Sequence, residues 1–188
     1  MNINNHSNLE GLHAFLSPSS VSWLNYNGDK LINTYINMQA KEKGTEDHEF
    51  AATCIKRRQK IYKTNDNLAN YVNDSVSMRM SPEVILYFSD YCFGTADAIS
   101  FEKGELRIND LKTGNTPAKM EQLEIYAALF CLEYNQDPNS IFIELRIYQY
   151  GEVFIYNPEP QRIIEVMNII KAHDRILTNY IQEIEKYE

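Results

Sequence analysis

Apolar positions in the N-terminal third recur every three or four residues, the spacing that places side chains on one face of an α-helix. The segment 17–20, Ser-Pro-Ser-Ser, is typical of a helix start because serine caps the first turn and proline fits it. We therefore predict a short helix carrying Trp23 and Leu24, a second helix over 31–40 and a third over 44–62. One face of the third helix holds His48, Ala52, Ile55 and Gln59.

A polar segment at 63–73 is expected to be an exposed link, after which apolar and polar residues alternate as they do in β-strands. An antiparallel meander of three strands is predicted at 83–91, 93–101 and 105–111. Glu102-Lys103-Gly104 is typical of a hairpin turn between the last two of them. Two more strands, joined by a tight turn at Tyr150-Gly151, are predicted at 140–148 and 152–156.

Two further helices are predicted, one between the strands and one at the end of the chain. The helix over 117–134 has an apolar stripe and a neighbouring face with Gln122 and Tyr126, four residues apart. The stripe consists of Leu123, Ala127, Phe130 and Tyr134. The helix over 158–187 is amphipathic, and its apolar side is expected to pack on the sheet, with a dimer contact as the alternative. That side consists of Ile163, Met167, Ile170, Leu177, Ile181 and Ile184.

This order of elements predicts an α/β (α+β) fold with a mixed central sheet flanked by helices. The chain has 188 residues, of which 44% are hydrophobic and 23% charged, and these values fit one ordinary soluble domain. We divide the single domain 1–188 into a helical N-terminal part at 13–62, a core at 83–156 and a C-terminal helix at 158–187.

Composition also predicts a cytoplasmic protein. No apolar run approaches the roughly 18 residues that a membrane span needs, and the Asn-rich N-terminus lacks the basic and apolar regions of a signal peptide. We expect no membrane contact. Cys54, Cys92 and Cys131 lie far apart without a Cys-x-x-Cys pair, which fits thiols in a reducing compartment. They predict neither an iron–sulfur cluster nor a zinc site.

The formal net charge of −8 counts against a nucleic-acid partner, because phosphate binding usually requires a basic surface. The total does not decide the question, since divalent cations bound by clustered carboxylates reverse the local sign of charge. Basic residues are also grouped at 56–60, Lys-Arg-Arg-Gln-Lys, where a solvated helix face is the simpler interpretation.

The residues that suggest chemistry are two acids on neighbouring predicted strands. Gly94-Thr95-Ala96 leads into Asp97, and the next strand ends with Asp110-Leu111-Lys112. Alternation along a strand puts Asp110 and Lys112 on one face, and the hairpin brings Asp97 alongside. Hard divalent cations prefer such oxygen ligands, and a nearby lysine can orient a water or stabilise phosphate charge. By itself, an Asp-x-Lys sequence is weak evidence and more often marks a surface ion pair.

The predicted order of elements resembles the core of the PD-(D/E)XK nuclease superfamily, whose element order is αβββαβ. In this chain it runs strand, turn, strand, the sequence Asp-Leu-Lys-Thr-Gly and a following helix. The resemblance implies a restriction-endonuclease-like fold in which Asp97, Asp110 and Lys112 are catalytic. It also implies Mg²⁺ or Mn²⁺ held by Asp97, by Asp110 and by the backbone carbonyl of Leu111.

Two further motifs are similar to those of the RecB-like branch, which includes nucleases of CRISPR adaptation. Gly44-Thr45-x-x-His48 resembles the segment that carries a metal-binding histidine, and Gln122-x-x-x-Tyr126 resembles the motif that lines the site near substrate phosphate. The segment 16–20 resembles the Leu-Ser-x-Ser start of these domains, which implies that Ser19 and Ser20 lie near nucleic acid; helix capping explains it equally well. The four cluster cysteines of some relatives are missing, so we expect no iron–sulfur cluster.

What this resemblance implies is a stand-alone or phage-type, Mg²⁺- or Mn²⁺-dependent DNA exonuclease of repair or recombination, acting on linear or single-stranded ends. Two alternatives stay open: a nuclease fold that binds nucleic acid or a partner without cutting, and a restriction-type endonuclease. The sequence also leaves open whether the protein forms homo-oligomers and whether it has a partner protein of recombination or replication. It does not give the polarity of cleavage or decide between DNA and RNA as the substrate.

Overall fold

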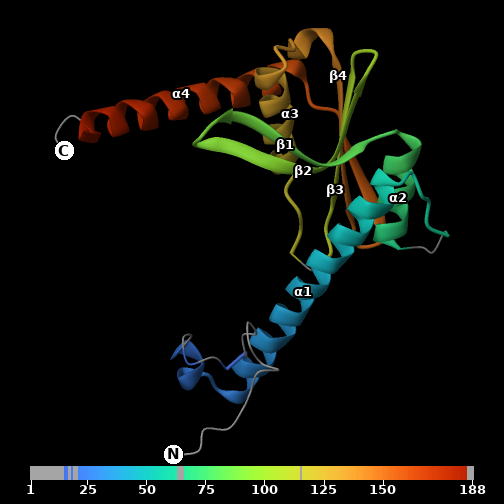
Figure 1. Ribbon diagram of the computed structural model, residues 1–188, viewed down its shortest axis with the longest axis vertical. Helices are drawn as coiled ribbons and strands as arrows, with labels where there is room; N and C mark the ends of the chain where they lie inside the picture. Colours follow the sequence, from blue (N-terminus) through green and yellow to red (C-terminus); the bar gives the residue numbers. More distant parts are fainter. Residues whose placement is uncertain (1–14, 17, 19–20, 63–65, 115, 186–188) are drawn as a thin grey trace, which may run out of the picture. The chain divides into compact units, whose positions relative to one another are not determined.

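The computed structural model of the chain describes residues 15–16, 18, 21–62, 66–114 and 116–185 (Figure 1). The chain divides into two compact units, 1–43 and 44–188. The single domain over 1–188 therefore stays a prediction. In the part of the chain that the structure describes, no helix is both long enough and apolar enough to span a membrane.

The first unit contains the 3₁₀ helix η2 (Val21–Asn25), which carries Trp23 and Leu24, and the start of α1 (Gly28–Lys56). Asn27 Oδ1 accepts a hydrogen bond of 2.8 Å from Lys30 N and so caps the first turn of α1. Two separate helices over 31–40 and 44–62 were predicted, and this was wrong, because α1 is helical throughout and ends at Lys56.

A helix also occupies much of the segment 63–73, which was wrongly predicted to be an exposed link. This helix, α2 (Asn67–Ser77), begins at Asp66, whose side chain accepts a hydrogen bond of 3.1 Å from Leu68 N. One face of α2 is apolar enough to be buried, although asparagines make its overall composition polar. The buried residues of α2 are Ala69, Tyr71, Val72 and Ser75.

Five strands form one mixed sheet in the order β1-β2-β3-β4-β5. Their bounds are Ser81–Ser89, Cys92–Glu102, Glu105–Leu111, Phe142–Gln149 and Glu152–Tyr156. All neighbours are antiparallel except β3 and β4, which are parallel and are connected through α3 (Glu121–Glu133) and the short η3 (Pro138–Ser140). The mixed α/β class with flanking helices and a long C-terminal helix is thereby confirmed.

The two predicted hairpin turns have the backbone that their residues favour. Lys103 and Gly104 have φ angles of 54° and 80°, and Tyr150 and Gly151 have φ angles of 57° and 77°. Two successive residues with positive φ match the twist of the strands they join. The turns therefore hold β2 against β3 and β4 against β5 in a fixed register.

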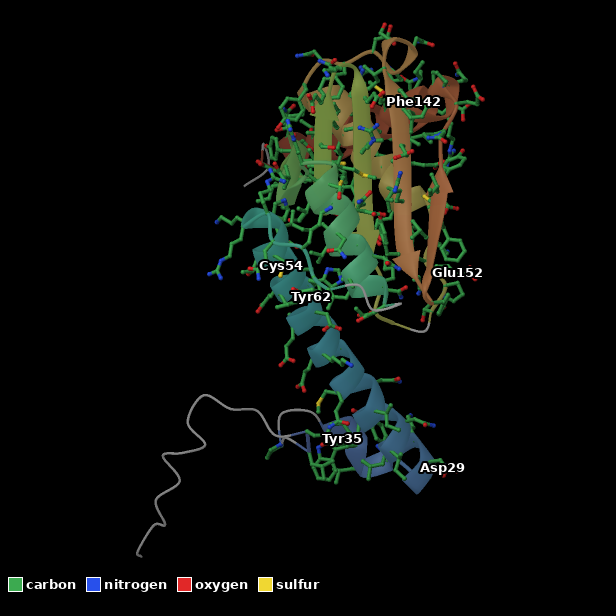
Figure 2. All side chains as sticks on the ribbon, turned by 90° about the vertical axis from the view of Figure 1, so that its right-hand side faces the viewer. Asp29, Tyr35, Cys54, Tyr62, Phe142 and Glu152 are labelled. Carbon is green, nitrogen blue, oxygen red and sulfur yellow. The ribbon has the colours of Figure 1, made fainter. Side chains whose placement is uncertain are left out.

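Helices cover both faces of the sheet within the second unit. On one face α3 and α4 (Pro160–Glu185) enclose a core around Leu106, Leu123 and Leu145 (Figure 1). On the other face α2 and the end of α1 enclose a second core around Ile55, Val72 and Leu111. Figure 2 shows Phe142 and Glu152 at opposite ends of the sheet, and β3 and β4 run together toward the Glu152 end.

α4 packs mainly on α3 rather than on the sheet, which corrects the prediction for the C-terminal helix. The nearly buried carboxylate of Glu124 on α3 accepts hydrogen bonds of 2.9 and 2.7 Å from Arg162 on α4. Ile163 and Ile170 of the predicted stripe are buried, whereas Leu177 is 43% exposed. α3 lies between the sheet and α4, so it is apolar on both sides and forms the middle layer.

Candidate active site

The candidate site lies where β2 and β3 part. The two strands pair from Glu102↔Glu105 to Ala98↔Asn109. Beyond that point β3 stays paired with β4 as far as Leu111↔Tyr148, while β2 continues beside β1. The backbone N–H of Leu111 donates instead to Asp97 Oδ2 at 3.0 Å. The Asp97 side chain thus accepts the hydrogen bond that a backbone carbonyl of a neighbouring strand would otherwise accept. We call the point where β2 and β3 separate the fork.

Asp110 is the first residue of β3 beyond this pairing, and its side chain is only 2% exposed. Lys112 Nζ donates to Asp110 Oδ1 at 3.2 Å and lies 3.0 Å from Oδ2, which accepts no hydrogen bond of good geometry from the described residues. Burial raises the pKa of Asp110 to about 6; the charge of Asp97 acts in the same direction and Lys112 opposes it. Oδ2 of this carboxylate is therefore buried and balanced mainly by the charge of Lys112.

Lys112 also donates to Gln122 Oε1 on α3 at 3.0 Å. The ammonium group is therefore held between a strand acid and a helix amide, with 30% of the side chain exposed. Tyr126 packs against β2 at Gly94, where an added Cβ would lie 3.1 Å from Tyr126 Cε1. The structure thus brings Gln122 to Lys112 and places Tyr126 against the strand that carries Asp97.

His48 reaches the same acids from α1. Its Nδ1 lies 3.4 Å from Asp97 Oδ2. One turn earlier Gly44 is buried, and a Cβ at this position would lie 2.6 Å from Thr113 Oγ1. The absence of a side chain at Gly44 lets the helix lie directly against the residue that follows Lys112. The glycine was interpreted as the start of a helix, but it allows a close approach inside one.

Glu83 belongs to the site and was not among the predicted residues. It lies between the pairs Pro82↔Ala98 and Val84↔Ala96, opposite Asp97, and has a φ angle of 51°. Ligand atoms of His48, Glu83 and Asp97 all lie within 4.8 Å of one another. The signal in the sequence was the hairpin register, because Glu83 and Asp97 are equally far along the chain from the turn at Asp90. A left-handed non-glycine residue in a strand is strained, and such strain is concentrated at functional sites.

This cluster has too little positive charge to balance its carboxylates. Burial raises the pKa of Glu83, and Asp97 raises it further. The pKa of the buried Tyr71 hydroxyl is also raised, first by burial and then by Asp97, Glu83 and Asp110. Glu83 is exposed and Asp97 half-buried, so the carboxylates repel one another at a partly solvated edge, and a bound cation would relieve that repulsion.

The carboxylate oxygens of Glu83 and Asp97 are donors that suit Mg²⁺ or Mn²⁺, whereas the imidazole of His48 favours a transition metal ion over Mg²⁺. Of the predicted ligands, Leu111 has its N–H at the cluster, and the role of its carbonyl stays a prediction. Ser19 and Ser20 lie outside the described residues.

Comparisons of the chain with protein-family models, with curated proteins and with solved structures found no match.

The raised pKa of Asp110 predicts a pH-dependent loss of stability in the metal-free protein. Unfolded aspartate ionises near pH 3.8 and folded Asp110 near pH 6, so the wild type loses stability as pH rises between these values. Asp110→Asn removes this loss. In urea titrations without metal, we expect the variant to match the wild type below about pH 4 and to exceed it by about 1–3 kcal/mol above pH 6.

Asp137→Asn is the matched control for Asp110, because hydrogen bonds from Asn139 lower the pKa of Asp137 and its contribution to stability has the opposite pH dependence. Added Mn²⁺ should stabilise the wild type more than Asp110→Asn. An advantage for Asp110→Asn that is the same at every pH would contradict the assigned titration.

The close approach at Gly44 predicts that Gly44→Ala weakens metal binding although alanine is worth about 1 kcal/mol more than glycine in a helix. The added methyl group must displace Thr113 or the helix, which moves His48 away from Asp97. Calorimetric titration with Mn²⁺ should show about tenfold weaker binding. Thr113→Ala in the same chain should restore it, and Gly28→Ala, where a Cβ meets nothing within 4 Å, should leave it unchanged.

Proposed function

We propose that the protein is a Mg²⁺- or Mn²⁺-dependent DNA nuclease that hydrolyses phosphodiester bonds from linear or single-stranded ends. The observation that carries the proposal is the convergence of a histidine, three carboxylates and Lys112 at the fork between β2 and β3. The order of elements from α2 to β4 is α-β-β-β-α-β, which is the order expected of the nuclease core. Three cysteines without a disulfide accord with the reducing cytoplasm in which we place the protein.

His48, Glu83 and Asp97 would hold the cation. Asp110 would join them through Oδ2, while its Oδ1 keeps the hydrogen bond from Lys112. A bound divalent cation would lower the pKa of a water and offset negative charge at the scissile phosphate. Asp97 is already oriented for this role, because Oδ2 accepts from Leu111 N. The chain therefore supplies a preformed set of ligands.

Lys112 has the geometry of the group that faces the phosphate. Asp110 and Gln122 hold its Nζ from two sides, at 3.2 Å and 3.0 Å, so the ammonium keeps one position at the edge of the acidic cluster. A fixed cation at this edge can stabilise negative charge that develops on phosphate oxygens and can orient a water by donating to it. Gln122 acts on the reaction by positioning Lys112.

Cleavage assays test the proposal directly. With Mn²⁺, the wild type should degrade end-labelled linear DNA, spare circular DNA and become inactive in EDTA. Lys112→Ala should lower the rate by a factor on the order of 10² to 10⁴ while the protein still folds, with a lower urea midpoint because Asp110 loses its ion-pair partner. Lys103→Ala, in the turn between β2 and β3, is the matched lysine control and should cleave like the wild type. Wild-type activity in Lys112→Ala, or no cleavage by the wild type, would contradict the assignment.

Glu83 gives a separate prediction about metal binding. Because its carboxylate lies within ligand distance of His48 and Asp97, Glu83→Gln should weaken Mn²⁺ binding by roughly 10–100-fold in calorimetric titrations. Glu102→Gln, at the end of β2 beside the turn, is the control and should bind Mn²⁺ like the wild type. An unchanged affinity in Glu83→Gln would remove Glu83 from the ligand set. A wild type that binds no Mn²⁺ would instead favour a non-cleaving nuclease fold.

A further inference from the structure

A pocket of about 620 Å³ opens beside Lys112, between α3 and the loop that connects it to β3. Lys112 and Gln122, which belong to the candidate active site, also line this pocket. Its other walls include Pro117, Ala118 and Ile125, with Lys119 at the same surface. The pocket is therefore continuous with the group that faces the phosphate in the proposed reaction.

Gln149 fixes the loop wall of this pocket. It lies at the end of β4, is 2% exposed, and its Nε2 donates to the carbonyl oxygens of Gly114 and Thr116, both at 2.8 Å. Its Oε1 accepts from Ala118 N at 2.9 Å. Because one buried amide holds three backbone groups of the loop, the wall has its shape without a ligand. These three hydrogen bonds involve both the nitrogen and the oxygen of the Gln149 side-chain amide.

The chemistry of the lining combines an apolar interior with positive charge at the edge. Ile125 is 43% exposed, lines the pocket and lies one turn after Gln122 on the same face of α3. Pro117 and Ala118 face it from the loop side of the pocket. Lys112 and Lys119 supply two cations and Glu121 one anion, so the charged lining is positive by one and the pocket suits an apolar group whose phosphate lies toward the lysines.

We propose that this pocket binds the nucleoside of the DNA strand that adjoins the phosphate at Lys112. The base packs against Pro117 and Ile125, and its phosphate lies toward Lys112 and Lys119. Because the base contacts protein rather than a complementary strand, the nucleotide bound there is unpaired. This inference rests on the nuclease function proposed above and adds the site at which the nucleoside of an unpaired end binds.

Binding of thymidine 5′-monophosphate to the metal-free, full-length protein tests the pocket by calorimetry. Ile125→Trp places an indole in the space of the base and should weaken binding at least about tenfold. Ile169→Trp is the matched control, since Ile169 is 51% exposed on α4 and should bind within about twofold of the wild type. Both changes are at exposed helix positions, and unfolding in urea checks that each variant folds.

A second variant and two smaller ligands separate the base from the phosphate. Lys119→Ala should weaken binding of the monophosphate but not of thymidine, which lacks the charged group. Inorganic phosphate should bind more weakly than the monophosphate. If phosphate binds as tightly as the monophosphate, or if Ile125→Trp binds like the wild type, the nucleoside pocket is refuted.

Kinetics distinguish failure of the pocket from failure of the nuclease. With single-stranded DNA and Mn²⁺, Ile125→Trp should raise KM about tenfold with a smaller change in kcat. Wild-type kinetics in Ile125→Trp would overturn the pocket and leave the nuclease assignment intact. Conversely, a wild type that binds the monophosphate in the expected way but does not cleave DNA would overturn the nuclease and leave the nucleotide site.

Discussion

The hydrogen bond from Leu111 N to Asp97 Oδ2 spans the point where β2 leaves β3, and the geometry of the whole site depends on it. Without this bond the parting of the strands would leave a backbone donor unpaired in a partly buried region, which costs roughly 1–3 kcal/mol. The same bond fixes the Asp97 carboxylate beside His48 and Asp110. One hydrogen bond therefore stabilises both the separation of β2 from β3 and the position of the Asp97 carboxylate.

The carboxylates of the site repel one another, and the surrounding fold must offset that repulsion. Burial and the charge of Asp97 raise the pKa values of Asp110 and Glu83, so ionising these acids opposes folding. Glu83 adds a left-handed backbone inside a strand. Two apolar cores, one on each face of the sheet, stabilise the elements that carry these groups. Such a local excess of strain and like charge is common where function rather than stability selects the residues.

Much of the fold was predictable because local signals and tertiary packing agree. Alternation gave the strands, and Gly104 and Gly151 marked turns whose positive φ angles favour glycine. α2 was missed because Asn67, Asn70 and Asn73 conceal a narrow apolar face in a polar composition. Gly44 was misread as a boundary because glycine disfavours helices, whereas here the contact with Thr113 outweighs propensity.

The site was predictable to the extent that it follows strand register. Asp97, Asp110 and Lys112 meet because adjacent strands and two-residue alternation require it. The place of Glu83 opposite Asp97 follows from the hairpin register, but no local pattern encodes its left-handed backbone. The role of Gln149 depends on a loop that folds back onto β4, which no local pattern encodes either. Residues whose roles arise from long-range packing become visible only in three dimensions.

The net charge of −8 is compatible with a DNA substrate only if positive charge is supplied where the phosphate binds. Within the basic run at 56–60, Arg58 donates to the carbonyl oxygen of Met80 at 2.7 Å and so stabilises the fold. Lys112 and Lys119 are two cations beside one pocket, and the acids next to them would recruit divalent cations. If the proposed nuclease function holds, this distribution of charge would favour contact with a single phosphate group at this edge over binding along a duplex.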